Sequence, residues 1–208
     1  GPGLTDVVCN GENLVTTAPR QPALLKLGPD GVCTRGRLLP SEMFEDLDLA
    51  VLDGERPVLS GHFTGTMIVD GVEATSQAGL EDAFFAVFDD NGDLVTLTTY
   101  GGLGTETPNE LVLDAAGDAY VVGEFLGSFR AGTMTAESLP DGDQDVFVLK
   151  MAPTGQIRWA TAFGGDGYQA ASALVLDVDG NLFVGGHTAG SIACASPAPQ
   201  NVGGTDIF

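Results

Sequence analysis

The chain has few positive charges and no long apolar stretch. Lysine and arginine together number 8 against 29 aspartates and glutamates, which gives a formal net charge of -21. An anionic polymer would be repelled, so nucleic acid and anionic membrane surfaces are poor candidates for partners. No apolar run reaches the ~18 to 20 residues of a membrane span, and no charged-then-apolar secretion signal stands at the start. We therefore expect no membrane insertion.

What is abundant is glycine, with 30 residues, accompanied by 11 prolines. This composition favours many short strands joined by tight turns over helices. Residues 1–3, Gly-Pro-Gly, are set aside as a tag or processing remnant. The acidic surface indicates solubility in a salty or extracellular medium, with divalent-cation binding at some acidic loops as the alternative.

The sequence repeats itself with a period of about 63 residues. A strand-forming triplet that begins with aspartate occurs three times, at offsets of 63 and 61, as Asp82-Ala83-Phe84, Asp145-Val146-Phe147 and Asp206-Ile207-Phe208. Turn glycines follow the same register at Gly54, Gly117 and Gly180. A fainter, shortened copy precedes these, with Gly11 and Gly31 in its two turns. Such self-similarity at a fixed long period indicates a repeat architecture.

Each unit contains four short apolar segments, for example SALVLDV, NLFVGGH, DVFVLKM and IRWATAF. The turns between them, such as VDGN, AAGD, PTGQ and DNGD, place glycine where a hairpin requires a positive φ. Clear alternation is lost in several segments, as expected where a strand is covered on both faces. Four antiparallel strands per repeat are typical of the blades of a β-propeller. We predict an all-β propeller of about 3.5 such blades.

The repeat resembles the bacterial β-propeller repeat known as SBBP. The resemblance is carried by GDQDVFVLKMAPTGQIRWATAFGGDG, by ALVLDVDGNLFVGGHTAG and by the intervening GSFRAGTMTAESLP, and it extends over residues 8–208. It implies an exported or cell-surface module, usually one part of a longer chain, with no activity common to the family. Departures from the pattern are a lengthened turn at 53–57, Thr96 in place of Trp159 and the eroded first unit.

The predicted units are a degenerate first blade at 4–42, blades at 43–102 and 103–165, and a partial blade at 166–208. A closed propeller requires about 4 to 8 blades. We therefore expect an incomplete ring that further blades, from the same or another chain, would close.

Three cysteines, Cys9, Cys33 and Cys194, are too few for a disulfide scaffold. The repeat places Cys9 on the first strand and Cys33 on the fourth strand of one sheet. Strands in those positions lie ~14 Å apart, whereas the Cα atoms of a bridged pair lie within ~7 Å. This geometry argues against a Cys9–Cys33 bridge.

Three possible metal ligands occupy the same position in successive repeats, namely His62, Glu124 and His187. Two histidines and a glutamate form a plausible zinc set. Equivalent positions on neighbouring sheets are ~10 Å apart, however, and a metal bond is only ~2 Å, so at most an adjacent pair could share a ligand. Variable loop residues are the alternative interpretation.

Two acidic runs are candidates for calcium. The first, at Asp177, Asp179 and Asn181, resembles the start of a calcium loop, but its glycine is fourth and Thr188 stands where an EF-hand has glutamate. A hairpin turn is the alternative. The second run contains Asp141 and Asp143. The repeated aspartate, Asp145 in this copy, is expected to accept backbone N–H bonds where a strand begins.

No nucleophile elbow or phosphate-binding glycine motif is present, so no catalytic residue and no certain cofactor are predicted. The sequence favours a secreted or cell-surface, bacterial-type module that is structural or binds a protein or glycan. The 18-residue excursions between second and third strands, such as GTMIVDGVEATSQAGLED, are the predicted contact segments. Two alternatives are a hydrolase or lyase whose site is completed by missing blades, and a calcium-stabilised adhesin.

Overall fold

The computed structural model describes residues 7–14, 21–39, 44–138, 143–193 and 206–207. The chain is an all-β protein, as the composition and turn pattern predict. Within the described ranges, the helical content is limited to one short 3₁₀ segment, η1 (Gln77–Gly79). The described residues therefore contain no helix that is long and apolar enough to cross a bilayer.

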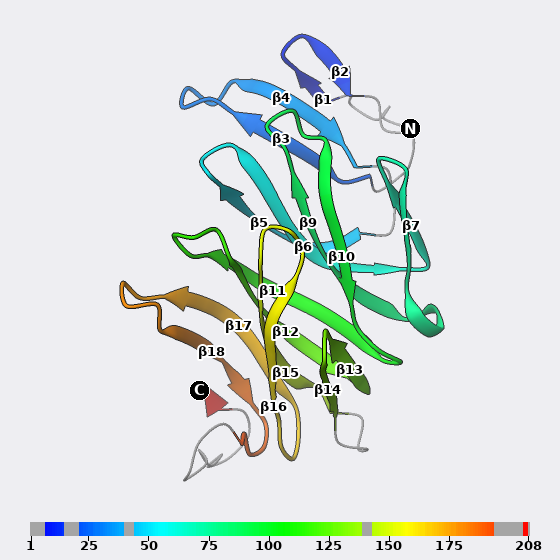
Figure 1. Ribbon diagram of the computed structural model, residues 1–208, viewed down its shortest axis with the longest axis vertical. Coiled ribbons are helices and arrows are strands. Elements are labelled where there is room, and N and C mark those ends of the chain that lie inside the picture. Colours follow the sequence, from blue (N-terminus) through cyan, green and yellow to red (C-terminus); the bar gives the residue numbers. More distant parts are fainter. Residues whose placement is uncertain (1–6, 15–20, 40–43, 139–142, 194–205, 208) are drawn as a thin grey trace.

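Two four-stranded antiparallel sheets form the centre of the molecule (Figure 1). The first, sheet A, has the order β10-β9-β6-β5, and the second, sheet B, has the order β11-β12-β15-β16. The strands of sheet A are β5 (Phe44–Leu52), β6 (Arg56–Thr64), β9 (Glu81–Phe88) and β10 (Leu94–Tyr100). The strands of sheet B are β11 (Thr105–Leu113), β12 (Ala119–Leu126), β15 (Asp145–Met151) and β16 (Ile157–Phe163).

Smaller sheets lie on either side of these two (Figure 1). On one side are the hairpins β1 (Val7–Cys9) with β2 (Glu12–Leu14) and β3 (Ala23–Leu27) with β4 (Cys33–Leu38). On the other side is the three-stranded sheet of β17 (Gln169–Leu176), β18 (Leu182–Thr188) and β19 (Asp206–Ile207).

The repeat is visible in the irregularities of the backbone as well as in the sequence. The register of the first two strands shifts at Glu45/Asp48, at Pro108/Glu110 and at Ala171/Ala173, which are spaced at or close to the 63-residue period. The turn glycines also share one left-handed conformation, with φ of +83° at Gly92 and Gly117. Bulges and αL glycines fix the register and the bend of a strand, so equivalent copies acquire equivalent shapes.

The third strands of sheets A and B, β9 and β15, are buried on both faces, which explains why their sequences do not alternate. In β15, Phe147 and Leu149 face the core between sheets A and B, whereas Val146 and Val148 face the core between sheet B and β17–β18. The equivalent strand β9 divides its side chains in the same way between two cores. Sheets covered on both faces require continuous apolar strands.

The long excursions fold into hairpins rather than irregular loops. They form β7 (Thr66–Val69) with β8 (Val72–Thr75), and β13 (Ser128–Ala131) with β14 (Met134–Glu137). Met67 and Val69 are buried in one core, and Phe129 and Ala131 are buried in the other. One face of each hairpin therefore seals a core, which leaves only the opposite face for contacts with a partner.

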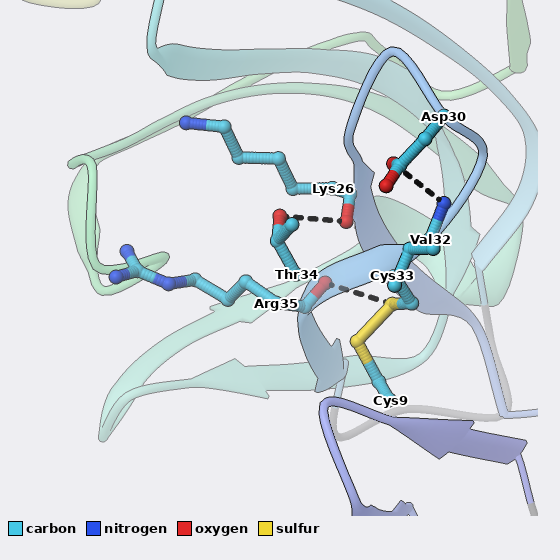
Figure 2. The surroundings of a disulfide bond; sticks show 7 residues. All are labelled: Cys9, Lys26, Asp30, Val32, Cys33, Thr34 and Arg35. Carbon is cyan, nitrogen blue, oxygen red and sulfur yellow. Dashed lines mark hydrogen bonds between the residues drawn. A yellow bond between two sulfur atoms is a disulfide. The ribbon is translucent and has the colours of Figure 1, made fainter.

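The geometric argument against a Cys9–Cys33 bridge is wrong, because the structure joins these residues in a disulfide with a Cα–Cα distance of 5.1 Å (Figure 2). The expected separation of ~14 Å applies only if the first unit folds as one four-stranded sheet. Instead, β1–β2 and β3–β4 form separate sheets, and both β1 and β2 contact β4. The shortened connection of the first copy allows its first hairpin to leave the expected strand order. Cys194 lies outside the described residues.

Candidate functional site

An apolar groove lies between the β3–β4 hairpin and the edge strand β5. Its volume is about 320 Å³. Leu49 and Val51 of β5 are 49% and 54% exposed on one wall, and Leu25 and Leu27 of β3 are 40% and 58% exposed on the other. Exposed apolar side chains that converge on a concavity are typical of a binding surface.

Charged side chains rim the groove. Three basic residues, Lys26, Arg35 and Arg37, line it together with three acidic ones, Glu55, Asp89 and Asp90. Arg37 is committed to the protein itself, because it forms ion pairs with Asp70 and Asp93 and its guanidinium lies 5.8 Å from the centroid of the Phe88 ring. The Arg35 guanidinium has no hydrogen bond or ion pair with the residues that the structure describes, so it is available to a ligand.

The calcium candidate at Asp177 is built as a turn. The Asp177 carboxylate accepts hydrogen bonds from the backbone N–H groups of Asp179 and Asn181, at 2.9 and 2.8 Å, and from the Asn181 side chain at 2.7 Å. Asp89 and Asp114 make the same two backbone contacts in the other copies. These hydrogen bonds to the ionised form hold the pKa of Asp177 below its ordinary value. An aspartate used in this way caps its own turn.

We expect Asp177→Ala to lower the free energy of unfolding, because two backbone N–H groups lose their acceptor. Asp177→Asn keeps an acceptor oxygen and should cost less. Chemical denaturation at pH 7 measures both. Millimolar Ca²⁺ should leave the melting temperature of the parent protein unchanged, and a rise that Asp177→Ala abolishes would favour the calcium loop instead.

The second acidic run is only partly observed. Asp141 lies outside the described residues. Asp143 is half-buried, and its charge raises the pKa of Asp145, although burial is the larger cause. The backbone N–H of Gly165 is hydrogen-bonded to the Asp145 carboxylate and opposes this rise. Within the described ranges, no group of three or more His, Cys, Asp or Glu side chains is arranged to hold a metal ion.

The three residues of the zinc hypothesis are in different environments. His62 is buried at 4% exposure, Glu124 is half-buried and His187 is exposed. Glu124 accepts a hydrogen bond of 2.9 Å from Asn109, and His187 on the next sheet is close enough for its charge to act on Glu124. Burial raises the pKa of Glu124, and Asn109 and His187 reduce the rise. Of the three residues, Glu124 and His187 are therefore linked by an electrostatic influence on the pKa of Glu124.

A buried pair of carboxyl groups, Asp82 and Glu106, was not predicted. Their exposures are 3% and 0%. Glu106 Oε1 accepts a hydrogen bond of 3.1 Å from the Gly102 N–H, and Asp82 Oδ2 accepts one of 3.1 Å from the Gln77 N–H. The second oxygen of each group, Oε2 and Oδ1, has no hydrogen-bond partner among the residues that the structure describes. Burial, and then the Asp82 charge, raise the pKa of Glu106 to about 8.

The repeat provides a comparison for this pair. Gln169 occupies the position of Glu106 in the next copy, 63 residues later, and Asp145 occupies that of Asp82. The Gln169 amide donates to the backbone oxygens of Asp166, Gly167 and Ser191, at 3.1, 2.6 and 3.3 Å. A protonated Glu106 also carries a hydrogen-bond donor, its O–H group, and in this respect it resembles the Gln169 amide. Glu106 and Gln169 each lie five residues after a repeated glycine, Gly101 and Gly164, and this spacing is visible in the sequence. The burial of the two side chains is not.

No known protein-family model matches this chain, and a comparison with curated proteins finds no significant match.

Proposed function

We propose that the chain is part of an SBBP-type β-propeller that acts outside the cell as a non-catalytic recognition or structural module. The observation that carries this proposal is the apolar groove with a charged rim between β3–β4 and β5. It offers exposed leucine and valine side chains to a partner, whereas the described carboxyl groups with the most strongly raised pKa are buried.

The propeller assignment is supported by the two central sheets. Sheets A and B each contain four antiparallel strands in the same chain-relative order, and their strand pairs carry equivalent bulges. They pack face to face through one shared core. Radially repeated four-stranded sheets of this kind are the unit from which propellers are built.

A protein partner fits the groove better than a glycan. The lining consists of aliphatic and charged residues, and it contains no Trp, Tyr or Phe. Sugar-binding surfaces generally depend on flat aromatic faces, which are rigid and amphipathic. The aliphatic walls instead suit leucine-like or valine-like side chains of a protein segment.

An extracellular location is supported by the Cys9–Cys33 disulfide, since such bonds persist in oxidising compartments. The net charge of -21 makes nucleic acid an unfavourable partner. For the hydrolase or lyase alternative, Asp82 and Glu106 would be the acid–base candidates. Glu106 is 0% exposed, however, so a substrate could reach it only after a rearrangement.

The proposal is tested by incubating the chain with immobilised peptide and glycan libraries and then analysing the probes by mass spectrometry. We expect saturable binding to peptides that carry aliphatic side chains, with the mass of every probe unchanged. Leu49→Asp, which places a charge in the groove, should reduce this binding, while Val175→Asp on the distant strand β17 should not. Cleavage of a probe that Glu106→Gln abolishes would contradict the non-catalytic role.

A further inference from the structure

The first copy of the repeat has one strand position unfilled in the described part of the chain. In sheets A and B the third strand is hydrogen-bonded on both sides, β9 between β10 and β6, and β15 between β16 and β12. The equivalent strand β3 is paired with β4 alone among the described strands. The disulfide explains this difference, because it holds the β1–β2 hairpin against β4 (Figure 2).

The register identifies the backbone groups on the open side of β3. The Leu39 N–H donates to the Pro22 carbonyl at 2.8 Å, and Leu24 is paired with Arg37. Because bonded residues alternate along an antiparallel strand, Leu24 and Lys26 bond to β4. The N–H and C=O groups of Ala23 and Leu25 therefore point to the opposite side, where an added strand could pair with them.

The groove runs along this open edge. Successive residues of β3, from Leu24 to Leu27, all line it, although neighbouring side chains of a strand point to opposite faces. A cavity reached by both faces of a strand lies beside its edge. Across the groove, Leu49 and Val51 offer aliphatic contacts at about half exposure. An extended segment would thus find backbone partners on one side and apolar contacts on the other.

The two lysines of the chain, Lys26 and Lys150, occupy the same repeat position. Their surroundings indicate which charge a segment bound beside β3 would carry. Lys150 in β15 pairs with Asp114 and Asp118 at 2.9 and 3.2 Å, and with the Tyr120 hydroxyl at 2.7 Å. These partners belong to β12 and the turn before it, the strand position that is open beside β3.

Lys26 has a weaker partner, because Glu55 is 3.9 Å away and both side chains are exposed. It also lies directly opposite Arg35, a second positive charge on the neighbouring strand. Both side chains extend to one side of the hairpin, away from the disulfide (Figure 2). Like charges opposite each other are unfavourable, and a carboxylate from an added strand would relieve this repulsion.

We propose that the open edge of β3 binds an extended, acidic and aliphatic segment of a partner protein as an additional antiparallel strand. The segment places aliphatic side chains against Leu49 and Val51 and a carboxylate beside Lys26 and Arg35. This inference rests on the proposed recognition role and names its site and partner class. Main-chain hydrogen bonds supply affinity in such strand addition, and the side-chain pockets supply specificity.

The probe for this edge comes from the chain itself. A fluorescein-labelled peptide with the sequence of residues 114–126, DAAGDAYVVGEFL, contains the strand that fills the equivalent position and the acids that pair with Lys150. Fluorescence anisotropy with the full chain should show saturable binding. A peptide in which both aspartates are replaced by lysine should bind at least tenfold more weakly, and equal binding of the two peptides would overturn the role of Lys26 and Arg35.

Variants of the protein locate the binding. Leu25→Pro removes one open-edge N–H, and Arg35→Glu reverses one charge without entering a core; each should weaken binding at least tenfold. Arg130→Glu, on the exposed face of β13, is the matched control and should bind normally. Circular dichroism shows whether each variant is folded. If Leu25→Pro unfolds, the binding measured with Arg35→Glu alone tests whether the peptide binds at the edge of β3.

The outcomes separate this inference from the proposed function. Absence of saturable binding by the probe, or unchanged binding by Leu25→Pro and Arg35→Glu, overturns strand addition at β3. If library peptides still bind those variants without cleavage, recognition occurs elsewhere and the proposed function stands. If the chain binds no library member and cleaves one, the recognition role itself fails.

Discussion

Phe147→Ala is expected to lower the free energy of unfolding by about 3 to 5 kcal/mol. The Phe147 ring is 0% exposed in the core between sheets A and B. It stacks on Phe129 with ring centroids 4.7 Å apart, and its centroid lies 5.9 Å from that of Tyr100. Alanine would remove the contact between β15 and the sealing hairpin β13–β14 and leave a cavity. Urea denaturation followed by circular dichroism measures the loss.

Phe183→Ala is the matched control for this prediction. Phe183 is 59% exposed on β18, so the same truncation should change the free energy of unfolding by less than about 1 kcal/mol. If Phe147→Ala cost no more than Phe183→Ala, the face-to-face packing of sheets A and B would be wrong.

Glu106→Gln is expected to stabilise the protein, and the gain should depend on pH. Glu106 has a pKa raised to about 8 in the folded state, against an ordinary value near 4.5. Between these values the folded state retains a proton that the unfolded state has lost. The stability of the parent protein therefore falls as pH rises from about 4.5 to about 8 and then levels off. Glutamine cannot ionise, so the variant lacks this contribution.

The stabilisation by Glu106→Gln should be small at pH 4 and reach about 5 kcal/mol above pH 8, at 1.36 kcal/mol for each unit of pKa shift. Denaturation curves at several pH values measure it. The exposed Glu73→Gln on β8 is the control and should give no comparable gain. The reciprocal change, Gln169→Glu, should create a second group of the same behaviour in the next copy. A gain from Glu106→Gln that is constant with pH would contradict a retained proton.

The fold was predictable from the sequence to the extent that local signals determine it. The strands DVFVLKM and IRWATAF form β15 and β16 as expected, because their turns carry glycine where φ must be positive. The first copy was not predicted correctly, since its strand order depends on a disulfide and not on local propensity. The excursions were expected to be contact loops, but Met67 and Phe129 are buried and seal the cores.

The candidate site was less predictable than the fold. Exposed aliphatic residues such as Leu49 and Val51 resemble ordinary core positions in a strand pattern, and only the structure shows that they line a groove beside β3. Glu106 is one acid among 29 in the sequence, so only its burial next to Asp82 distinguishes it. At Asp177, by contrast, the structure has the hairpin turn that the sequence offered as the alternative to calcium.

Residue-resolved amide hydrogen exchange of the free protein by NMR distinguishes an open edge of β3 from a filled one. We expect slow exchange along the whole interior of β9 and β15, which are bonded on both sides. In β3 we expect alternation, with slow exchange at Leu24 and Lys26 and fast exchange at Ala23 and Leu25. Uniform protection along β3 would show that its edge is already filled, and would contradict the open strand position on which the binding site depends.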